Sequence, residues 1–472
     1  MIMDTTLHNH IFNEFIKSYE TRDYPINNKI RNITFDHLDE LYKLQEDGIV
    51  RDVVIENIER SLLCRTIYLG VDYFECPDCG RETTIPHSCH CRFCNACGIT
   101  YAKQLAATAV TTCIDVPHRH IVFTIPDSLR NWFRQDRSRL DILFIAARNT
   151  ISLLMNPKLL KKIKKQKLKN GRYIFENYRD KKEFGAIASL HTFGRDLKWN
   201  PHIHMLVAEA SYDKKTKKVK RFHHFNFDKL RKTFQFELLR LIEEAVGADS
   251  FRREKTILYN RHKEGFYVYA RTMEEDSEFS VKNNSKNINA CISYCMRYAA
   301  RPAMAESRII EYDKANKKVT WFYDDHTDNK RYTVVDKAMD FIKKLILHIP
   351  EKGFHNLRHY GFYSNAASST LDEIHEVLGK NKKPNTKAIR KEERTQLFNK
   401  LKYRTNMIDS FNRDPIKCKC GSLMLYNETF NPLKGDSNDS NYRRNCINEM
   451  QEMQLRGGGP KMDFGRTLRV RS

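Results

Sequence analysis

The sequence predicts an α+β fold in which a small cysteine-rich domain links a helical N-terminal module to a larger domain with antiparallel strands. Three observations lead to this prediction. Apolar residues recur at helical spacing before residue 64, six cysteines fall between Cys76 and Cys97, and two strand-like segments at 185–192 and 201–208 are joined by a short turn. Between residues 114 and 300 the chain alternates short strands with helices.

Composition and charge narrow the class of protein. The chain has 472 residues, of which 40% are hydrophobic, and this is enough apolar material for about three domains. A net charge of +23 and a pI near 9.4 indicate a polyanionic partner. No apolar run is long enough to span a membrane, and the first residues do not resemble a secretory signal. We therefore expect a cytoplasmic protein without a membrane partner.

Residues 1–64 are expected to form a small helical module. Its apolar residues follow one another at three-residue or similar helical spacing: Phe35, Leu38, Leu41, Leu44, Ile55, Ile58 and Leu62.

Residues 65–113 contain the most specific compositional signal, a dense block of cysteines. In Cys76-Pro-Asp-Cys79 and in Cys94-Asn-Ala-Cys97 the two-residue spacer lets a turn direct both thiolates at one tetrahedral ion. These four cysteines are predicted to hold one structural Zn²⁺, since a chain without an export signal keeps its thiols reduced. Four further candidate ligands either form a second zinc site or are spare: His87, Cys89, His90 and Cys91.

A histidine pair lies on the strand-like segment at 201–208. His202 and His204 project from the same face of such a strand, because side chains alternate with period two. The preceding strand would place His191 beside them in an antiparallel hairpin, giving a three-imidazole site with open positions for a substrate oxygen. A His-x-His triplet also arises by chance in a chain with 18 histidines, so the pair by itself is weak evidence.

A tyrosine pair follows on the expected helix at 290–301. Tyr294 and Tyr298 are four residues apart and share one helix face. Two core or interface tyrosines would have the same spacing, which leaves their role open at this point.

Lysine and arginine are concentrated in three runs at 156–182, 213–232 and 380–404. Each run alone could be a solvated surface, whereas three on one chain favour a track for a polyanion. The first run is expected to be an amphipathic basic helix. Residues 435–472 have a composition that does not bury a core, and they are expected to form a flexible tail.

The motifs in their order resemble those of the rolling-circle transposases of the IS91 type, within the HUH endonuclease superfamily. The similarity extends over about residues 60–365. It rests on Cys76-Pro-Asp-Cys79-Gly, Ser88-Cys89, Cys94-Asn-Ala-Cys97, His120-Ile-Val-Phe-Thr-Ile-Pro126, Leu190-His-Thr-Phe-Gly-Arg-Asp-Leu197, Pro201-His202-Ile203-His204, Tyr294-Cys-Met-Arg-Tyr298, Arg301, Arg308, Pro350-Glu-Lys-Gly-Phe354 and Arg358-His-Tyr-Gly361.

The resemblance implies a central antiparallel sheet that carries the histidine pair, with helices packed on one side. The expected domains are a helical module (1–64), a zinc-binding domain (65–113), a nuclease domain (114–370) with basic insertions near 156–182 and 211–285, a basic region (371–434) and the tail. It also implies that Tyr294 and Tyr298 are nucleophiles and that His202 and His204 hold Mg²⁺ or Mn²⁺. We infer His191 as the third ligand, because related conjugative relaxases have a similar histidine spacing.

Two departures from the family pattern are visible. The inner Cys89-His-Cys91 is denser than the family's usual spacing. The family often has a two-residue-spaced cysteine pair where this chain has Cys418-Lys-Cys420-Gly421, and the shorter spacer yields no zinc prediction there.

The activity implied is nicking and rejoining of single-stranded DNA at element ends through a 5′-phosphotyrosine, inside a bacterial cell and in association with the nucleoid. The partners would be end and target DNA together with a host helicase and replication proteins. The chain has no G-x4-G-K-[S/T] phosphate loop, so no nucleotide cofactor is expected. The candidate DNA-binding residues are Lys161, Lys162, Lys164, Lys165, Arg301 and Arg358.

Three alternatives remain at this stage. A plasmid replication initiator or relaxase would use the same chemistry but reclose only its own origin. A non-catalytic zinc-ribbon DNA-binding regulator would not need the histidines to share an ion. A metal-dependent hydrolase that uses water would leave no protein–DNA adduct.

Overall fold

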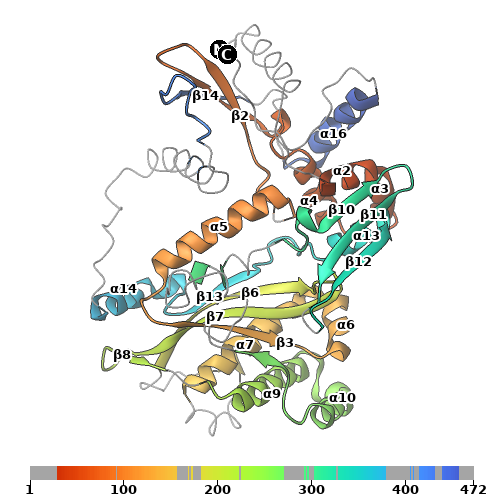
Figure 1. Ribbon diagram of the computed structural model, residues 1–472. Helices are drawn as coiled ribbons and strands as arrows, with labels where there is room; N and C mark the ends of the chain where they lie inside the picture. The colour runs from red at the N-terminus through yellow and green to blue at the C-terminus, as the bar shows by residue number, and fades with distance from the viewer. Residues whose placement is uncertain are drawn as a thin grey trace.

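Figure 1 shows the fold of the chain in a computed structural model. The structure describes residues 29–91, 93–156, 168–169, 172–173, 182–222, 225–270, 292–293, 295–296, 302–325, 328–378, 404, 408, 414–430 and 438–455. The predicted nucleophiles Tyr294 and Tyr298 lie outside these residues, and so do Arg301 and the four predicted DNA-binding lysines.

A sheet of antiparallel strands forms the centre of the fold, and the α+β prediction is confirmed. The strand order is β13-β6-β7-β3-β9, and β8 pairs with the far end of β7. The strands are β3 (His118–Thr124), β6 (Lys182–Phe193), β7 (Trp199–Asp213), β8 (Lys218–Arg221), β9 (Val268–Tyr269) and β13 (Leu357–Gly361). A separate two-stranded pair is formed by β4 (Leu168–Lys169) and β5 (Arg172–Tyr173).

Helices cover one face of this sheet, and a large apolar core lies between the helices and the strands. In Figure 1, α7 and α9 lie below the strands, and α6 and α10 extend this layer. Alternate strand residues such as Ala188, Ile203 and Met205 point into this core, which follows from the period-two alternation of a strand. The helices are α6 (Asp127–Gln135), α7 (Leu140–Met155), α9 (Phe227–Val246) and α10 (Ala248–Arg261).

The opposite face of the sheet packs on α5 (Asn95–Thr112), which Figure 1 shows above the strands. Ile187 and Leu206 belong to this second core, together with Ala106 and Ala109 of α5. By strand alternation, His191, His202 and His204 belong to this same face. The helix α14 (Ser368–Val377) contributes Ile374 to the same core.

The N-terminal helices share one core with distant parts of the chain. The helices α2 (Lys29–Asp36), α3 (Leu38–Glu46) and α4 (Asp52–Leu62) pack with a three-stranded sheet and with α13 (Ala338–Ile346). The three strands of that sheet are β10 (Ile309–Asp313), β11 (Lys318–Asp324) and β12 (Arg331–Lys337), in that order. The predicted helical module is therefore built into a larger unit.

The prediction of a flexible tail from residue 435 is wrong for its first part. Ser440–Leu455 form the helix α16, which packs against α4. Cys446, Ile447 and Met450 are buried in the N-terminal core. Arg443 forms a buried ion pair with Glu59 of α4, with Nε 2.8 Å from Oε2.

A small sheet separate from the central one joins an N-terminal segment to a C-terminal one. Its order is β14-β1-β2, with β1 (Val71–Glu75) in the middle between β2 (Glu82–Pro86) and β14 (Leu425–Phe430). Among the described residues, no helix is both long and apolar enough to cross a membrane.

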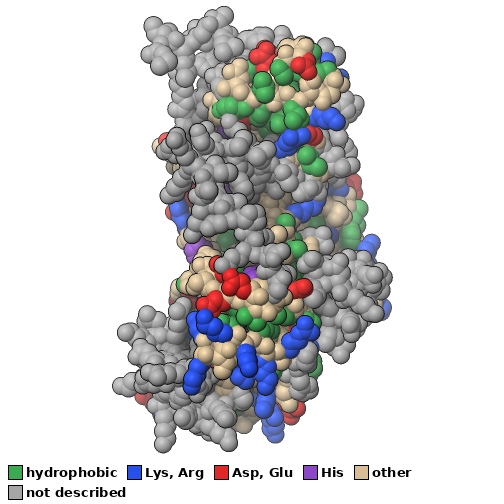
Figure 2. Space-filling view, turned by 90° about the vertical axis from the view of Figure 1, so that its left-hand side faces the viewer, with side chains coloured by type: hydrophobic (Ala, Val, Ile, Leu, Met, Phe, Trp, Pro, Cys, Tyr) green, Lys and Arg blue, Asp and Glu red, His purple; other side chains and the backbone are tan. Residues whose placement is uncertain are grey.

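The described part of the second basic run lies on the surface. Lys214, Lys215 and Lys217 are exposed in the turn between β7 and β8, and Lys218 is exposed at the start of β8. The side of the molecule where Figure 1 places β8 faces the viewer in Figure 2, and Lys and Arg side chains gather on its lower part.

Candidate active site and cysteine clusters

Three histidines meet on two neighbouring strands. His191 of β6 is the register partner of His202 of β7, and Ser189 is the partner of His204. One ring nitrogen of each of the three histidines lies within 4.8 Å of the others. The β6–β7 hairpin thus brings together the three histidines that the sequence singles out.

Hydrogen bonds orient two of these imidazoles. Nδ1 of His202 lies 2.7 Å from the carbonyl oxygen of Asn200 and donates to it, so its lone pair is on Nε2. Nδ1 of His204 lies 2.9 Å from Nε2 of His120, on the adjacent strand β3. His120 was not predicted as a site residue, although it lies in the strand motif that begins at that position.

Burial favours the neutral form of two of the three imidazoles, those of His202 and His204. It lowers the pKa of His202 to about 4, and it lowers the pKa of His204 well below its usual value, with the neighbouring histidines adding to the effect. Neutral imidazoles are the form that coordinates a divalent ion. The donor set therefore fits a divalent cation held by three nitrogens.

The segment that contains the tyrosine pair is described only in part. Ile292, Cys295 and Met296 are buried at 1 to 2% exposure in the core on the histidine-bearing face of the sheet. They pack there with Ile187 and Leu206, two residues before Ser189 and two after His204.

A cavity of about 390 Å³ opens beside the histidine cluster. His191 and Phe193 line it from β6, Phe93 lines it from the cysteine-rich segment, and Arg137 lines it from the turn before α7. The two flat rings are side chains on which exposed bases can stack. The Arg137 guanidinium itself donates to the carbonyl oxygens of Leu347 and Ile349.

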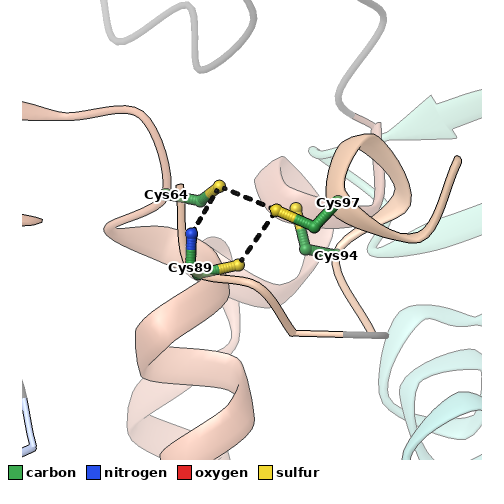
Figure 3. A group of neighbouring side chains, drawn as sticks. All are labelled: Cys64, Cys89, Cys94 and Cys97. Atoms are coloured by element: carbon green, nitrogen blue, oxygen red, sulfur yellow. Dashed lines mark hydrogen bonds between the residues drawn. The ribbon is translucent and has the colours of Figure 1, made fainter. Parts of the chain in front are cut away.

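One cluster of four cysteines is buried at the start of α5. It consists of Cys64, Cys89, Cys94 and Cys97, whose sulfurs all lie within 4.8 Å of one another. The Sγ of Cys97 lies 3.6 Å from that of Cys64 and 3.6 Å from that of Cys89, as Figure 3 shows. The backbone N–H of Cys89 also donates to the Cys64 sulfur at 3.3 Å.

A second cluster consists of Cys76, Cys79, Cys418 and Cys420. The predicted set of Cys76, Cys79, Cys94 and Cys97 is therefore wrong, because its two halves belong to different clusters. Cys64 follows α4 and lies outside the dense block, so no spacing signal indicated it. The sequence left the role of Cys418 and Cys420 open.

The other candidate zinc ligands lie outside both clusters. His87 contacts the carbonyl of Leu69 at 3.1 Å and Asp72 at 3.2 Å, and the hydrogen bond to Asp72 raises its pKa. Cys91 lies next to the buried cluster without being a member of it, and His90 belongs to neither group. Of the candidates between the two spaced pairs, only Cys89 joins a cluster.

Arg358, predicted to contact DNA, has partners within the protein. Its guanidinium pairs with Asp141 and lies 4.2 Å from the centre of the Phe144 ring. It is therefore held against α7 at the helix-covered side of the sheet.

Two family models match this chain. A model described as "Putative transposase" matches residues 185–370, and one described as "Transposase zinc-binding domain" matches residues 33–125. The first range contains the β6–β7 hairpin with its histidines, and the second contains both Cys64 and the dense cysteine block.

Two relatives are similar over most of the chain. The "Transposase for insertion sequence element IS801" of Pseudomonas savastanoi pv. phaseolicola is 28% identical over 398 residues, which cover 83% of this chain and 87% of the relative. The "Putative transposase y4qJ" of Sinorhizobium fredii (strain NBRC 101917 / NGR234) is 23% identical over 325 residues, covering 67% and 76%. No solved structure matches.

Proposed function

The chain belongs to the IS91 family of transposases, and on that premise we propose that it nicks and rejoins single-stranded DNA through a 5′-phosphotyrosine intermediate. The observation that carries this proposal is the cluster of His191, His202 and His204 on the sheet face against which Ile292, Cys295 and Met296 pack. These residues flank Tyr294 in the sequence.

In the proposed reaction the three imidazoles hold a divalent ion, Mg²⁺ or Mn²⁺. When bound, such an ion polarises the scissile phosphate and offsets the charge that develops on its oxygens. The phenol oxygen of Tyr294 or Tyr298 attacks the phosphorus, the bond to the 3′ oxygen breaks, and that oxygen leaves as a free 3′-OH. A second 3′-OH reverses the step on the tyrosyl phosphate, so no nucleotide is consumed.

The cavity beside His191 supports a single strand as the substrate. Its lining combines Phe93, Phe193 and Arg137, and exposed bases of a single strand can stack on the two rings. Paired bases in a duplex are not available for this contact. The strand separation would then come from a host helicase and replication proteins.

The test is covalent capture of DNA by the full-length protein. With a labelled oligonucleotide that carries the element's end and with Mn²⁺ present, the protein should form an adduct that survives denaturing electrophoresis. The double variant Tyr294→Phe/Tyr298→Phe should form none while it still binds the oligonucleotide, and each single variant should retain partial cleavage.

Tyr360→Phe is the matched control, because Tyr360 lies on the same sheet but packs against the helix-covered core. This variant should form a normal amount of adduct. An undiminished adduct in the double tyrosine variant would show that another residue is the nucleophile. Cleavage by the wild-type protein without any adduct would point to attack by water.

A further inference from the structure

The cysteine cluster of Cys76, Cys79, Cys418 and Cys420 joins two loops that are about 340 residues apart in the sequence. Cys76 and Cys79 lie in the turn between β1 and β2, and Cys418 and Cys420 precede β14. The Sγ atoms of Cys76 and Cys420 are 3.5 Å apart, and those of Cys79 and Cys418 are 3.6 Å apart.

These distances are those of a metal site and not of disulfides. A disulfide needs sulfurs about 2.05 Å apart, and all four cysteines are free. With Zn–S bonds of about 2.3 Å, the edges of a tetrahedron of thiolates are about 3.8 Å long. The two separations between the loops, 3.5 and 3.6 Å, are close to this length.

The two loops repeat one hydrogen-bonding pattern. In the first, the N–H of Cys76 donates to the Arg81 carbonyl at 2.8 Å, and the N–H of Arg81 donates to the Cys79 sulfur. In the second, the N–H of Cys418 donates to the Ser422 carbonyl at 2.8 Å, and the N–H of Ser422 donates to the Cys420 sulfur. The second loop makes the same contacts with one residue fewer.

A glycine completes each loop. Gly80 follows Cys79 with φ of +65°, and Gly421 follows Cys420 with φ of +100°. Both lie in the left-handed region that favours glycine, and each N–H donates to the carbonyl of the first cysteine of its own loop, at 2.9 and 3.0 Å respectively. The one-residue spacer of Cys418-Lys-Cys420 therefore still forms a two-thiolate knuckle.

Protein contacts beneath the loops bring them together. β14 pairs with β1 along the strand, from Val71 opposite Phe430 to Glu75 opposite Leu425. A small apolar core under the cluster includes Phe74, Ile85 and Met424 along with the buried Cys76 and Cys418. Ser422 also donates to Asp78 from one loop to the other.

We propose that Cys76, Cys79, Cys418 and Cys420 bind a second Zn²⁺, which fastens the segment 414–430 to the β1–β2 hairpin. Four thiolates without a histidine or carboxylate favour Zn²⁺, and they leave no open position for catalysis. The inference does not depend on the DNA chemistry proposed above. It assigns a structural role to the C-terminal cysteines, whose spacing alone predicts no metal site.

The first test counts zinc in the full-length protein. Elemental analysis should find two Zn²⁺ per wild-type chain and one in the double variant Cys418→Ser/Cys420→Ser. The variant Cys446→Ala, which removes a buried C-terminal cysteine that belongs to neither cluster, should retain two. One Zn²⁺ in the wild type, or two in the double variant, would overturn the proposal.

The second test uses the unaltered protein, so it does not depend on whether a variant folds. Cys79 and Cys420 are exposed, and ordinary exposed thiols react readily with iodoacetamide. With zinc bound, both should resist alkylation, and chelation should raise their rates together by at least tenfold, as read by mass spectrometry. Equal rates with and without the chelator would exclude the site.

Discussion

Nδ1 of His204 and Nε2 of His120 lie 2.9 Å apart, and this contact between β7 and β3 orients an imidazole at the centre of the histidine cluster. The two rings are nearly parallel, with an interplanar angle of 12°. Because Nδ1 of His204 faces His120, Nε2 is the nitrogen that would bind the ion. Partners of this kind fix the tautomer and the direction of a metal-ligating histidine.

We therefore predict that His120→Ala weakens binding of Mn²⁺ by about 10- to 100-fold. His120→Gln should restore most of the affinity, because its amide oxygen can accept the proton of His204. Binding of Mn²⁺ is measured by titration calorimetry, with His262→Asn as the control. His262 follows α10 and contacts Phe266 on the helix-covered side of the sheet. Unchanged affinity in His120→Ala would remove His120 from the site.

The buried cysteine cluster gives a second prediction, which separates a ligand from a neighbour. Cys64→Ser should lose one Zn²⁺ and destabilise the N-terminal unit, since Cys64 is one of the four clustered thiols. Cys91→Ser should keep its zinc, because Cys91 is buried beside the cluster but is not part of it. Zinc content and thermal unfolding are measured on both variants. Equal zinc content in the two would contradict the assignment.

The ion pair between α4 and α16 gives a third prediction. Glu59 is 1% exposed and Arg443 is 3% exposed. Removing Arg443 takes the nearest positive charge from a buried carboxylate, which then keeps only the Tyr42 hydroxyl at 3.1 Å and the more distant Arg444 at 3.6 Å. Arg443→Met should lower the free energy of unfolding by about 3 to 5 kcal/mol. The matched variant is Arg444→Met. The half-exposed side chain of Arg444 lies 3.6 Å from Glu59, and its replacement should lower the free energy of unfolding by at most about 1 kcal/mol. Urea titration measures the free energy of unfolding of both variants, and a loss in Arg443→Met no larger than that in Arg444→Met would contradict the prediction.

The sequence predicted the histidine cluster because its signals are local. Period-two alternation places His202 and His204 on one face, and a short turn to the preceding strand fixes the register that sets His191 opposite His202. His120 comes from a strand about 80 residues earlier, and only the sheet order brings it to the cluster.

The sequence identified Cys76, Cys79, Cys94 and Cys97 as metal ligands, but it joined them in one site and did not include Cys64, Cys418 or Cys420. A C-x-x-C spacing tells which two thiolates share an ion, and it does not tell which second pair completes the tetrahedron. Here the pairing of β1 with β14 places Cys76 and Cys79 beside Cys418 and Cys420. The sequence of α16 is mostly polar, so it likewise did not indicate that a few of its residues pack against the N-terminal core.

The last prediction concerns the lysines at 158–169, most of which lie outside the described residues. A lysine ammonium is a point charge, so we expect this segment to bind phosphates without reading bases. Affinity for end-sequence and unrelated oligonucleotides should fall together as salt rises, with a log–log slope of about −0.7 per phosphate contacted on a single strand.

Replacing Lys161, Lys162, Lys164 and Lys165 by Gln should flatten that slope by about 0.7 for each phosphate that the protein no longer neutralises. The same change should lower the affinity for both oligonucleotides by a similar factor. The control is Lys314→Gln/Lys317→Gln, since these lysines already pair with Asp36 and Glu40 and should leave the slope unchanged. Fluorescence anisotropy at several salt concentrations measures all three proteins. If the quadruple variant lost only its preference for the end sequence, the segment would be a recognition element. A purely electrostatic contact binds every sequence alike, so its loss cannot change the preference for one sequence over another.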